Sequence, residues 1–402
     1  MPAYLQYIST LVPEFAYPQA AARDLVTTWT SHPRTQRIIH ALYDRSGINT
    51  RYSVCGDFVP GREPNLFKPG PDGIPLSPGT GERNALYATA SRDLAVRLAR
   101  QLLQEAAADF APEDITHIIF TSCTGFANPG PDFHIIRELG LSGQTQRYTL
   151  GFMGCYAAFP TMRMAAQFCE ADPEAVVLIM CLELCSLHLQ FNDQPDFILA
   201  NSLFADGAAA AIVSSKTPRA GSSGYRFNGF STSLLPTGER DMAWDIGNHG
   251  FNLVLSSYVP DVIATNVRSL IEETLTQEGL SLASIDSWAV HPGGRAILDR
   301  VQDSLALGPN ALQASRKVLR DYGNMSSATV LFVLKELLAS GPPRRDMTCA
   351  LAFGPGLTVE TAVLERLPQG TLSGQPVDLS LCTAGEATPS STLVPEPIGC
   401  GA

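Results

Sequence analysis

The sequence predicts an α/β fold built from two similar halves, and three observations support this. Several short segments are apolar at every position, which is typical of strands buried on both faces of a sheet. Longer segments with apolar residues at helical spacing lie between them, so helices are expected to cover both faces. The same order of strands and helices occurs before and after about residue 215.

The first half begins with an extended apolar segment at residues 4–18. A helical pattern follows over residues 20–46, with an interruption at Pro33 because proline lacks a backbone donor. Residues 65–82 are rich in proline and glycine and are expected to form a loop. A long amphipathic helix is predicted over residues 89–108.

The remaining predicted elements alternate between strand and helix along the chain. In order, they are a strand at residues 115–121, a helix at 132–139, a helix after Cys155, strands at 175–182 and 207–213, a helix at 251–275, a strand at 287–290, helices at 294–305 and 326–339, and a strand at 348–353. We therefore expect two halves, residues 1–215 and 216–367. Residues 368–402 have few large apolar side chains to offset the entropy of ordering, so this tail is expected to be disordered.

Composition narrows the classes of function. The 402 residues are 45% hydrophobic and 17% charged, as in an ordinary soluble globular protein. The formal charge of -11 argues against nonspecific binding to nucleic acid or to an anionic membrane, because both reward Lys and Arg. No uncharged apolar segment reaches the roughly 18 residues of a membrane helix, and residues 1–20 lack a signal-peptide pattern.

The nine cysteines are odd in number and scattered, which favours free thiols and a reducing cytoplasm. Cys181 and Cys185 lie near His188, but no pair has the spacing of a zinc ribbon. We therefore expect no metal site.

One cysteine is a candidate nucleophile. Cys155 ends the segment Gly-Phe-Met-Gly-Cys and precedes a run of good helix formers, so it is expected at or near a helix N-terminus. Free backbone N–H groups and the positive end of the helix dipole favour a thiolate there. The alternative is a buried structural cysteine, which is the commoner role of this residue type.

Three further motifs place polar groups or tight turns after predicted elements. His291 follows a buried strand and precedes Pro-Gly-Gly, so it is expected to face a cleft at the edge of the sheet, unless loop carbonyls satisfy it. Asn324 lies just before a predicted helix, where a simple N-cap is the alternative. The turn Gly354-Pro355-Gly356 is expected to bring backbone close to whatever fills the cleft.

Together, the motifs Met-Gly-Cys, His-Pro-Gly-Gly, Gly-Asn-Met-Ser and Phe-Gly-Pro-Gly resemble the signature of type III polyketide synthases, the chalcone synthase-like branch of the thiolase fold. The resemblance covers residues 4 to about 367. It implies a duplicated α-β-α-β-α five-layered fold, a five-stranded mixed sheet in each half, and a homodimer. It also implies a nucleophile at Cys155, a triad completed by His291 and Asn324, and a gatekeeper phenylalanine at Phe204.

The chemistry implied by this resemblance uses CoA thioesters and no further cofactor. Cys155 would accept an acyl starter from an acyl-CoA, and malonyl-CoA would lose carbon dioxide and condense with it. The product would cyclise to a pyrone, resorcinol or phloroglucinol-like ring. His291 is expected to hold Cys155 as a thiolate and, together with Asn324, to stabilise the enolate oxygen.

The resemblance also implies a cavity and a CoA-binding surface. The further residues expected at the cavity are Cys123, Cys185, His188, Trp244, Leu253 and Ser326. Leu253 stands where plant members have a second gatekeeper phenylalanine, and Trp244 where they have a cavity glycine. Of three basic residues usual around the CoA phosphates only Arg45 is retained, because Ile38 and Ala41 occupy the other positions. The nearby basic residues expected to substitute are Arg37, His40 and Arg51.

Three alternatives remain at this point. A ketoacyl synthase of the same fold uses the same triad types, but it would need a basic patch for acyl carrier protein. A papain-like cysteine hydrolase has its Cys, His and Asn in this chain order, but the Cys-Gly-Ser-Cys-Trp sequence is absent. A catalytically silent partner subunit usually lacks the cysteine, which is present here.

Overall fold

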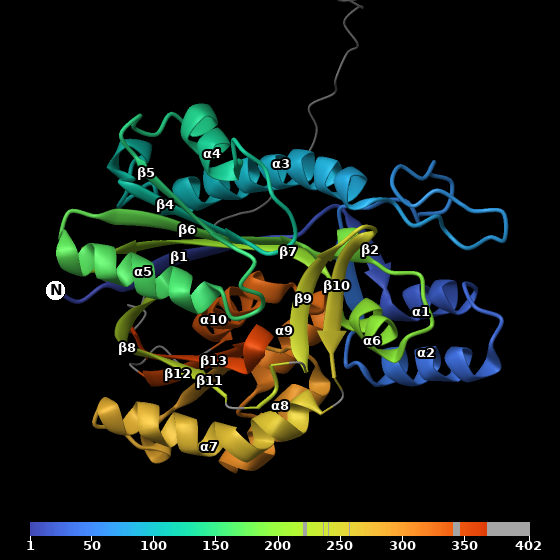
Figure 1. The fold of residues 1–402 in the computed structure, drawn as a ribbon. Coiled ribbons are helices and arrows are strands. Elements are labelled where there is room, and N and C mark those ends of the chain that lie inside the picture. The colour runs from blue at the N-terminus through green and yellow to red at the C-terminus, as the bar shows by residue number, and fades with distance from the viewer. Residues whose placement is uncertain (220–222, 236, 240, 257, 341–345, 368–402) are drawn as a thin grey trace, which may run out of the picture. The chain divides into compact units, whose positions relative to one another are not determined.

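The computed structural model describes residues 1–367 apart from 220–222, 236, 240, 257 and 341–345. These residues form five layers in which helices and sheet alternate (Figure 1). The disorder expected for residues 368–402 lies outside the described residues. No helix among the described residues combines the length and apolar character needed to cross a membrane.

The helices and strands have the following bounds. The strands are β1 Tyr4–Leu11, β2 Phe15–Pro18, β3 Thr50–Ser53, β4 His117–Ser122, β5 Gln146–Gly151, β6 Val176–Leu184, β7 Asp206–Ser214, β8 Gly224–Leu234, β9 Met242–Gly247, β10 Gly250–Leu255, β11 Ser287–Val290, β12 Asp346–Gly354 and β13 Thr358–Arg366. The α-helices are α1 Gln19–Thr27, α2 Pro33–Arg45, α3 Thr80–Ala106, α4 Pro131–Leu139, α5 Ala158–Ala171, α6 Pro195–Leu203, α7 Val259–Gln277, α8 Arg295–Leu305, α9 Gln313–Tyr322 and α10 Thr329–Ser340.

Nine strands form one mixed sheet in the order β11-β12-β13-β8-β1-β7-β6-β4-β5. The two halves repeat one pattern: a parallel pair (β4/β6 or β11/β12) is followed by two antiparallel pairs (β6/β7/β1 or β12/β13/β8). The prediction of a duplicated, five-layered α/β fold is therefore confirmed. One detail differs, because the described part of the second half contributes four strands to the sheet rather than five. Antiparallel pairing of β1 with β8 joins the halves.

Three apolar cores fill the spaces between the layers. One lies between α3 and the strands of the first half, and another between α7, α8 and the strands of the second half. The largest core contains residues of α5 and α10 and lies between the two parts of the sheet (Figure 1). Strands such as β7, in which every residue is buried, are apolar at most positions because both of their faces are covered.

Several predicted boundaries are wrong. Residues 4–18 are expected to form one extended entry segment, but they form two strands, β1 and β2, and β1 is a central strand of the sheet. The helix predicted from residue 251 begins only at Val259, because residues 250–255 pair with β9 in a hairpin. The first residue after the turn of this hairpin is Gly250, whose φ of +104° is a conformation that favours glycine. Helix α3 begins at Thr80, inside the segment expected to be a loop.

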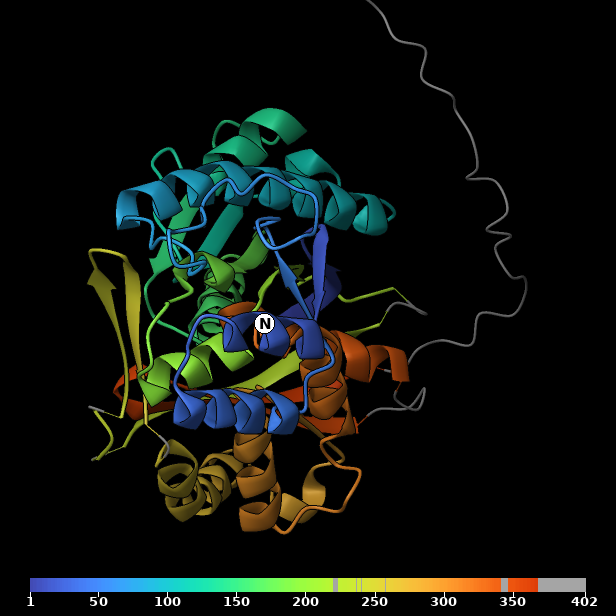
Figure 2. The same ribbon diagram turned by 90° about the vertical axis from the view of Figure 1, so that its right-hand side faces the viewer.

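The elements outside the five layers gather at one end of the molecule. The β9–β10 hairpin, α6, α1 and α2 lie there (Figure 1), and α1 and α2 are in front in the second view (Figure 2). The candidate site lies between these elements and the layered core, because its cavity is lined by residues of the hairpin, α2 and α6 as well as by residues of the core loops.

Candidate active site

Cys155 lies in a tight turn between β5 and α5, three residues before the first residue of the helix. The turn needs unusual backbone angles, with Phe152 at φ +60° and Gly154 at φ +88°. The Ala157 N–H donates to the Gly154 carbonyl at 3.1 Å, which closes the turn. The prediction of a cysteine near a helix N-terminus is therefore confirmed. Cys155 itself remains partly accessible from the cavity.

We expect Gly154→Ala to reduce activity by at least about 100-fold and to lower stability by about 1–3 kcal/mol. A Cβ at this position would lie 2.5 Å from Pro355 Cδ, and the backbone is in the left-handed region. The turn that carries Cys155 would therefore be pushed away from the Gly-Pro-Gly turn. Product formation and thermal unfolding check this. Gly143→Ala is the control, because no atom lies within 4 Å of its added Cβ, and an equal effect of both variants would contradict the explanation.

His291 lies directly after β11, and its N–H continues the parallel pairing by donating to the Leu351 carbonyl at 2.8 Å. Its side chain is 1% exposed. Among the described residues, neither ring nitrogen has a hydrogen-bond partner. The alternative of a histidine satisfied by loop carbonyls is therefore wrong. A buried, unpaired imidazole is costly for stability, so its retention points to a ligand or a reaction.

Asn324 is held in a fixed orientation between α9 and α10. Its Oδ1 accepts from the Ser326 N–H at 2.9 Å, and its Nδ2 donates to the Gly293 carbonyl at 3.2 Å. This contact is not a helix cap, because the short helix Ser326–Ala328 has Met325 as its N-cap and no side-chain cap. A second N–H of the Asn324 amide stays available. The backbone of Asn324 also pairs with Leu203 and Ala205 on either side of Phe204. This contact brings the two halves together at the site.

Cys155, His291 and Asn324 line one cavity of about 290 Å³, the Cys155 cavity. The other predicted residues that line it are Phe204, Cys123, Cys185, Trp244, Leu253, Ser326 and Pro355. Gly354 and Gly356 do not line it; a Cβ on Gly354 would lie 2.3 Å from Tyr156 Cδ1, so this glycine allows close packing beside the nucleophile turn. His188 does not line it either. It lines a neighbouring cavity.

Burial controls the ionisation of the two reactive groups. It raises the pKa of the Cys155 thiol to about 11, with hydrogen bonding to Ser326 and Asn324 opposing the shift and the Glu183 carboxylate adding to it. It lowers the pKa of the His291 imidazole to about 3. Burial therefore favours the neutral form of both groups and works against the expected thiolate–imidazolium pair. The reason is that desolvation disfavours both charged forms.

Glu183, near the end of β6, is a residue of the site that the sequence reasoning missed. It is fully buried and accepts from the Cys123 N–H at 2.9 Å, from Thr124 Oγ1 at 3.0 Å and from the Ser327 hydroxyl. Cys123 Sγ lies between it and Ser326 Oγ, at 3.4 and 3.3 Å. Burial raises the pKa of Glu183. The sequence does contain a signal for this residue, because Glu183 is the one charged residue in the otherwise apolar strand β6.

The predicted CoA-binding arginines separate into two groups. Arg37 and Arg45 are exposed on α2. Arg51 is instead used inside the protein: its guanidinium donates to Gln19 Oε1 at 2.8 Å and to the carbonyls of Asn201 and Phe204 at 2.7 and 2.8 Å. The Nε and Nη1 donors of Arg51 are used in this way, which weighs against a role for this residue in binding CoA.

A Cys, a His and an Asn that line one cavity of a five-layered, duplicated fold define a condensing enzyme of the thiolase class. The family model of chalcone and stilbene synthases matches in two parts, the N-terminal domain at residues 2–217 and the C-terminal domain at residues 228–368. The chain belongs to this family and is a type III polyketide synthase, a malonyl-CoA-dependent condensing transferase.

Proteins with similar amino-acid sequences support this assignment. The alpha-pyrone synthesis polyketide synthase-like Pks18 of Mycobacterium tuberculosis is 30% identical over 369 residues, 89% of this chain and 90% of the relative. The probable polyketide synthase 1 of Dictyostelium discoideum is 33% identical over 277 residues, 67% of this chain but only 9% of that relative.

Solved structures agree with the fold. The polyketide synthase PKS-I of the brown alga Ectocarpus siliculosus has a TM-score of 0.84 and 30% identity, covering 91% of this chain and 98% of that chain. The 1,3,6,8-tetrahydroxynaphthalene synthase of Streptomyces coelicolor has a TM-score of 0.79 and 29% identity, covering 92% and 99%.

Proposed function

We propose that this enzyme loads an acyl group from an acyl-CoA onto Cys155, extends it with malonyl-CoA, and cyclises the chain to a pyrone, resorcinol or phloroglucinol-type product. The observation that carries this proposal is that Cys155, His291 and Asn324 line the same buried cavity. Their side chains supply a nucleophile, a base and a fixed amide donor. No cofactor other than the CoA thioesters is needed for these steps.

In the loading step, the neutral imidazole of His291 accepts the proton of the Cys155 thiol. The sulfur then attacks the thioester carbonyl of the starter, and the CoA sulfur leaves with the proton returned by His291. The acyl group remains on Cys155 as a thioester. Burial favours the neutral imidazole, so a ring nitrogen keeps the lone pair that accepts this proton.

In the extension step, malonyl-CoA loses carbon dioxide, and the electrons of the broken bond form an enolate on the thioester oxygen. The free N–H of Asn324 and an N–H of His291 donate to this oxygen. Its α-carbon then attacks the acyl carbonyl on Cys155, the C–S bond breaks, and the chain leaves on CoA two carbons longer. One donor of this kind typically contributes about 3 kcal/mol to the transition state.

We propose that Arg45 and Arg295 bind the phosphates of CoA. Leu42 of α2 and Ala296 of α8 line the Cys155 cavity, so these two helices border it. The Cβ of Arg295 lies 3.6 Å from where a Cβ on Gly47 would lie, so the side chain extends along the end of α2 near Arg45.

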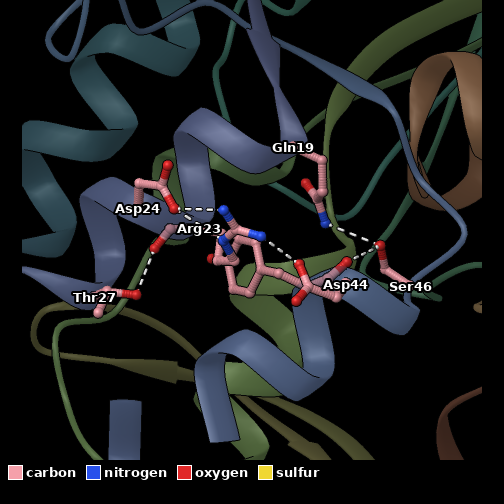
Figure 3. Close-up of polar contacts among 7 residues, drawn as sticks. Gln19, Arg23, Asp24, Thr27, Asp44 and Ser46 are labelled. Atoms are coloured by element: carbon pink, nitrogen blue, oxygen red, sulfur yellow. Dashed lines mark hydrogen bonds and ion pairs between the residues drawn. The ribbon is translucent and has the colours of Figure 1, made fainter. Parts of the chain in front are cut away.

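The charges around these two arginines favour a phosphate. Asp44 is bound by Arg23 at 2.6 Å (Figure 3). Asp299 is bound by Arg316 at 2.7 Å and is 3.6 Å from Arg295. Arg45 is exposed at the C-terminal end of α2. Neighbouring carboxylates are therefore largely neutralised by other arginines, which leaves Arg45 and Arg295 for an anion. Exposed Arg37, on the same helix, is a further candidate.

We expect the double variant Arg45→Gln/Arg295→Gln to raise KM for malonyl-CoA by about tenfold, since charged hydrogen bonds to phosphate are lost. It should leave the kinetics of the malonyl thioester of N-acetylcysteamine unchanged, because this donor has the reacting group but no phosphates. Steady-state kinetics with both donors check this, with Arg97→Gln on α3 as the control. Equal losses for the two donors would contradict phosphate binding.

The overall proposal is tested by incubating the enzyme with malonyl-CoA and a panel of acyl-CoAs, and by identifying products by mass. We expect products whose masses equal the starter plus two-carbon units, less CoA. Hydrolysis of the acyl-CoA without any condensation would refute the proposal.

We also propose a homodimer in a reducing cytoplasm. The edge strand β5 and the neighbouring side chain of Phe126, which is 46% exposed, support an interface there. The seven cysteines among the described residues are free thiols, as suits that compartment. Light scattering of the purified protein tests the dimer, and a monomer at micromolar concentration would refute it.

A further inference from the structure

A second cavity, of about 440 Å³, adjoins the Cys155 cavity and has no part in the steps above. Residues of α1, α6, β2 and β3 line it. Helix α1 is at the end of the molecule that faces the viewer in Figure 2. The volume of this cavity falls within the range of small-molecule sites, about 300–1,000 Å³. Its far wall includes Ala22 and Leu25 of α1 together with Trp29 and Phe58.

The two cavities share four residues. Cys185, Phe204, Trp244 and Leu253 line both, so they form a partition about one side chain thick. Leu253 and Trp244 pair across the β9–β10 hairpin. The Trp244 indole N–H donates to the Cys123 carbonyl at 2.9 Å, which fixes the ring at the partition. A group attached to Cys155 therefore needs to pass only this partition to enter the second cavity.

The described wall of the second cavity carries a single charged side chain. Arg51 is the only Lys, Arg, Asp or Glu among the described residues that line it, and its Nε and Nη1 are bound to Gln19, Asn201 and Phe204. His188 donates from Nε2 to the Thr124 carbonyl at 2.7 Å and accepts from the Phe251 N–H at 3.1 Å. Burial lowers its pKa to about 4, so it is neutral at pH 7. The cavity therefore suits an apolar ligand.

Arg51 also supports the partition directly. Its Nη1 binds the Phe204 carbonyl, while the neighbouring residues Leu203 and Ala205 pair with the backbone of Asn324. The backbone of Phe204 is thus held from both cavities. Passage between them then depends on rotation of the Phe204, Trp244 and Leu253 side chains rather than on movement of the chain.

We propose that the second cavity receives the alkyl tail of the starter, so that the enzyme is selective for acyl-CoAs with medium or long linear chains. This inference rests on the proposed loading of Cys155 with an acyl group. Each methylene moved from water into such a cavity favours binding by about fourfold. We therefore expect kcat/KM to rise with starter length until the cavity is filled.

Ala22→Trp tests this by filling the far end of the second cavity without touching the Cys155 cavity. We measure kcat/KM for acyl-CoAs of two, six, ten and fourteen carbons. The expected result is a loss of at least about tenfold for the fourteen-carbon starter and a change of less than about twofold for acetyl-CoA. Ala20→Trp, exposed on the same helix and outside the cavity lining, is the matched control and should change neither.

A second variant keeps the proposal testable if the first variant does not fold. Ala200→Leu fills the same cavity from α6, and it should reproduce the selective loss if Ala22→Trp does not fold. An unchanged ratio of long to short starters in a folded variant would overturn the proposal. So would shorter products from acetyl-CoA with no change in starter preference, because the growing polyketide would then occupy the cavity.

The outcomes also separate this inference from the proposed function. If the wild-type enzyme extends acetyl-CoA but shows no dependence on chain length, only the alkyl site is wrong. If no acyl-CoA of any length acylates Cys155, the proposed loading step itself fails.

Discussion

Cys155→Ala is expected to lower polyketide formation by at least about 10⁴-fold while leaving the fold intact. In the proposed mechanism the Cys155 sulfur holds the acyl chain between extensions, and alanine removes it without adding volume. Intact-protein mass spectrometry after incubation with an acyl-CoA should show no adduct. Circular dichroism and thermal unfolding should match the wild type.

Cys349→Ala provides the matched control for this experiment. Cys349 is fully buried on β12 and does not line the Cys155 cavity. Its variant should still acquire one acyl group per chain. Covalent labelling of Cys155→Ala at the wild-type rate would mean that another residue carries the acyl group.

Asn324→Ala is expected to slow decarboxylation of malonyl-CoA by about 10²–10³-fold, because one of the two donors to the enolate oxygen is lost. Loading of Cys155 should change much less, since that step depends on His291 as the base. Release of labelled carbon dioxide and acylation by the starter, measured separately, distinguish the two effects.

Asn310→Ala, an exposed asparagine outside the cavity, is the control for this variant. The same decarboxylation rate in Asn324→Ala and wild type would remove Asn324 from the oxyanion site. His291→Ala should impair both steps, because the imidazole serves in each.

Much of the fold follows from local pattern, but not all of it. The strands β6 and β7 are apolar at nearly every position, so their burial on both faces was predictable. β1 was not recognised as a central strand, because its partners β7 and β8 come about 200 residues later. The hairpin at residues 242–255 was missed because its second strand is as apolar as the helix that follows it.

The site shows the same limit. Cys155, His291 and Asn324 were found because each occupies a short motif whose neighbours are visible in the sequence. The contacts of Arg51 and Glu183 depend on partners from distant segments, so the neighbouring sequence does not indicate them. The charge state of the Cys–His pair likewise depends on burial, which the motifs do not specify.

The position of β1 has a consequence for biosynthesis. One edge of β1 pairs with β7 within the first half, but the other pairs with β8, which begins at Gly224. A nascent chain that has just completed β7 therefore presents an unpaired strand edge until roughly twenty more residues leave the ribosome, a period of about 1–4 s. Exposed strand edges promote aggregation. Pairing of β8 with β1 soon after β8 is synthesised therefore protects the nascent chain from aggregation and also completes the sheet.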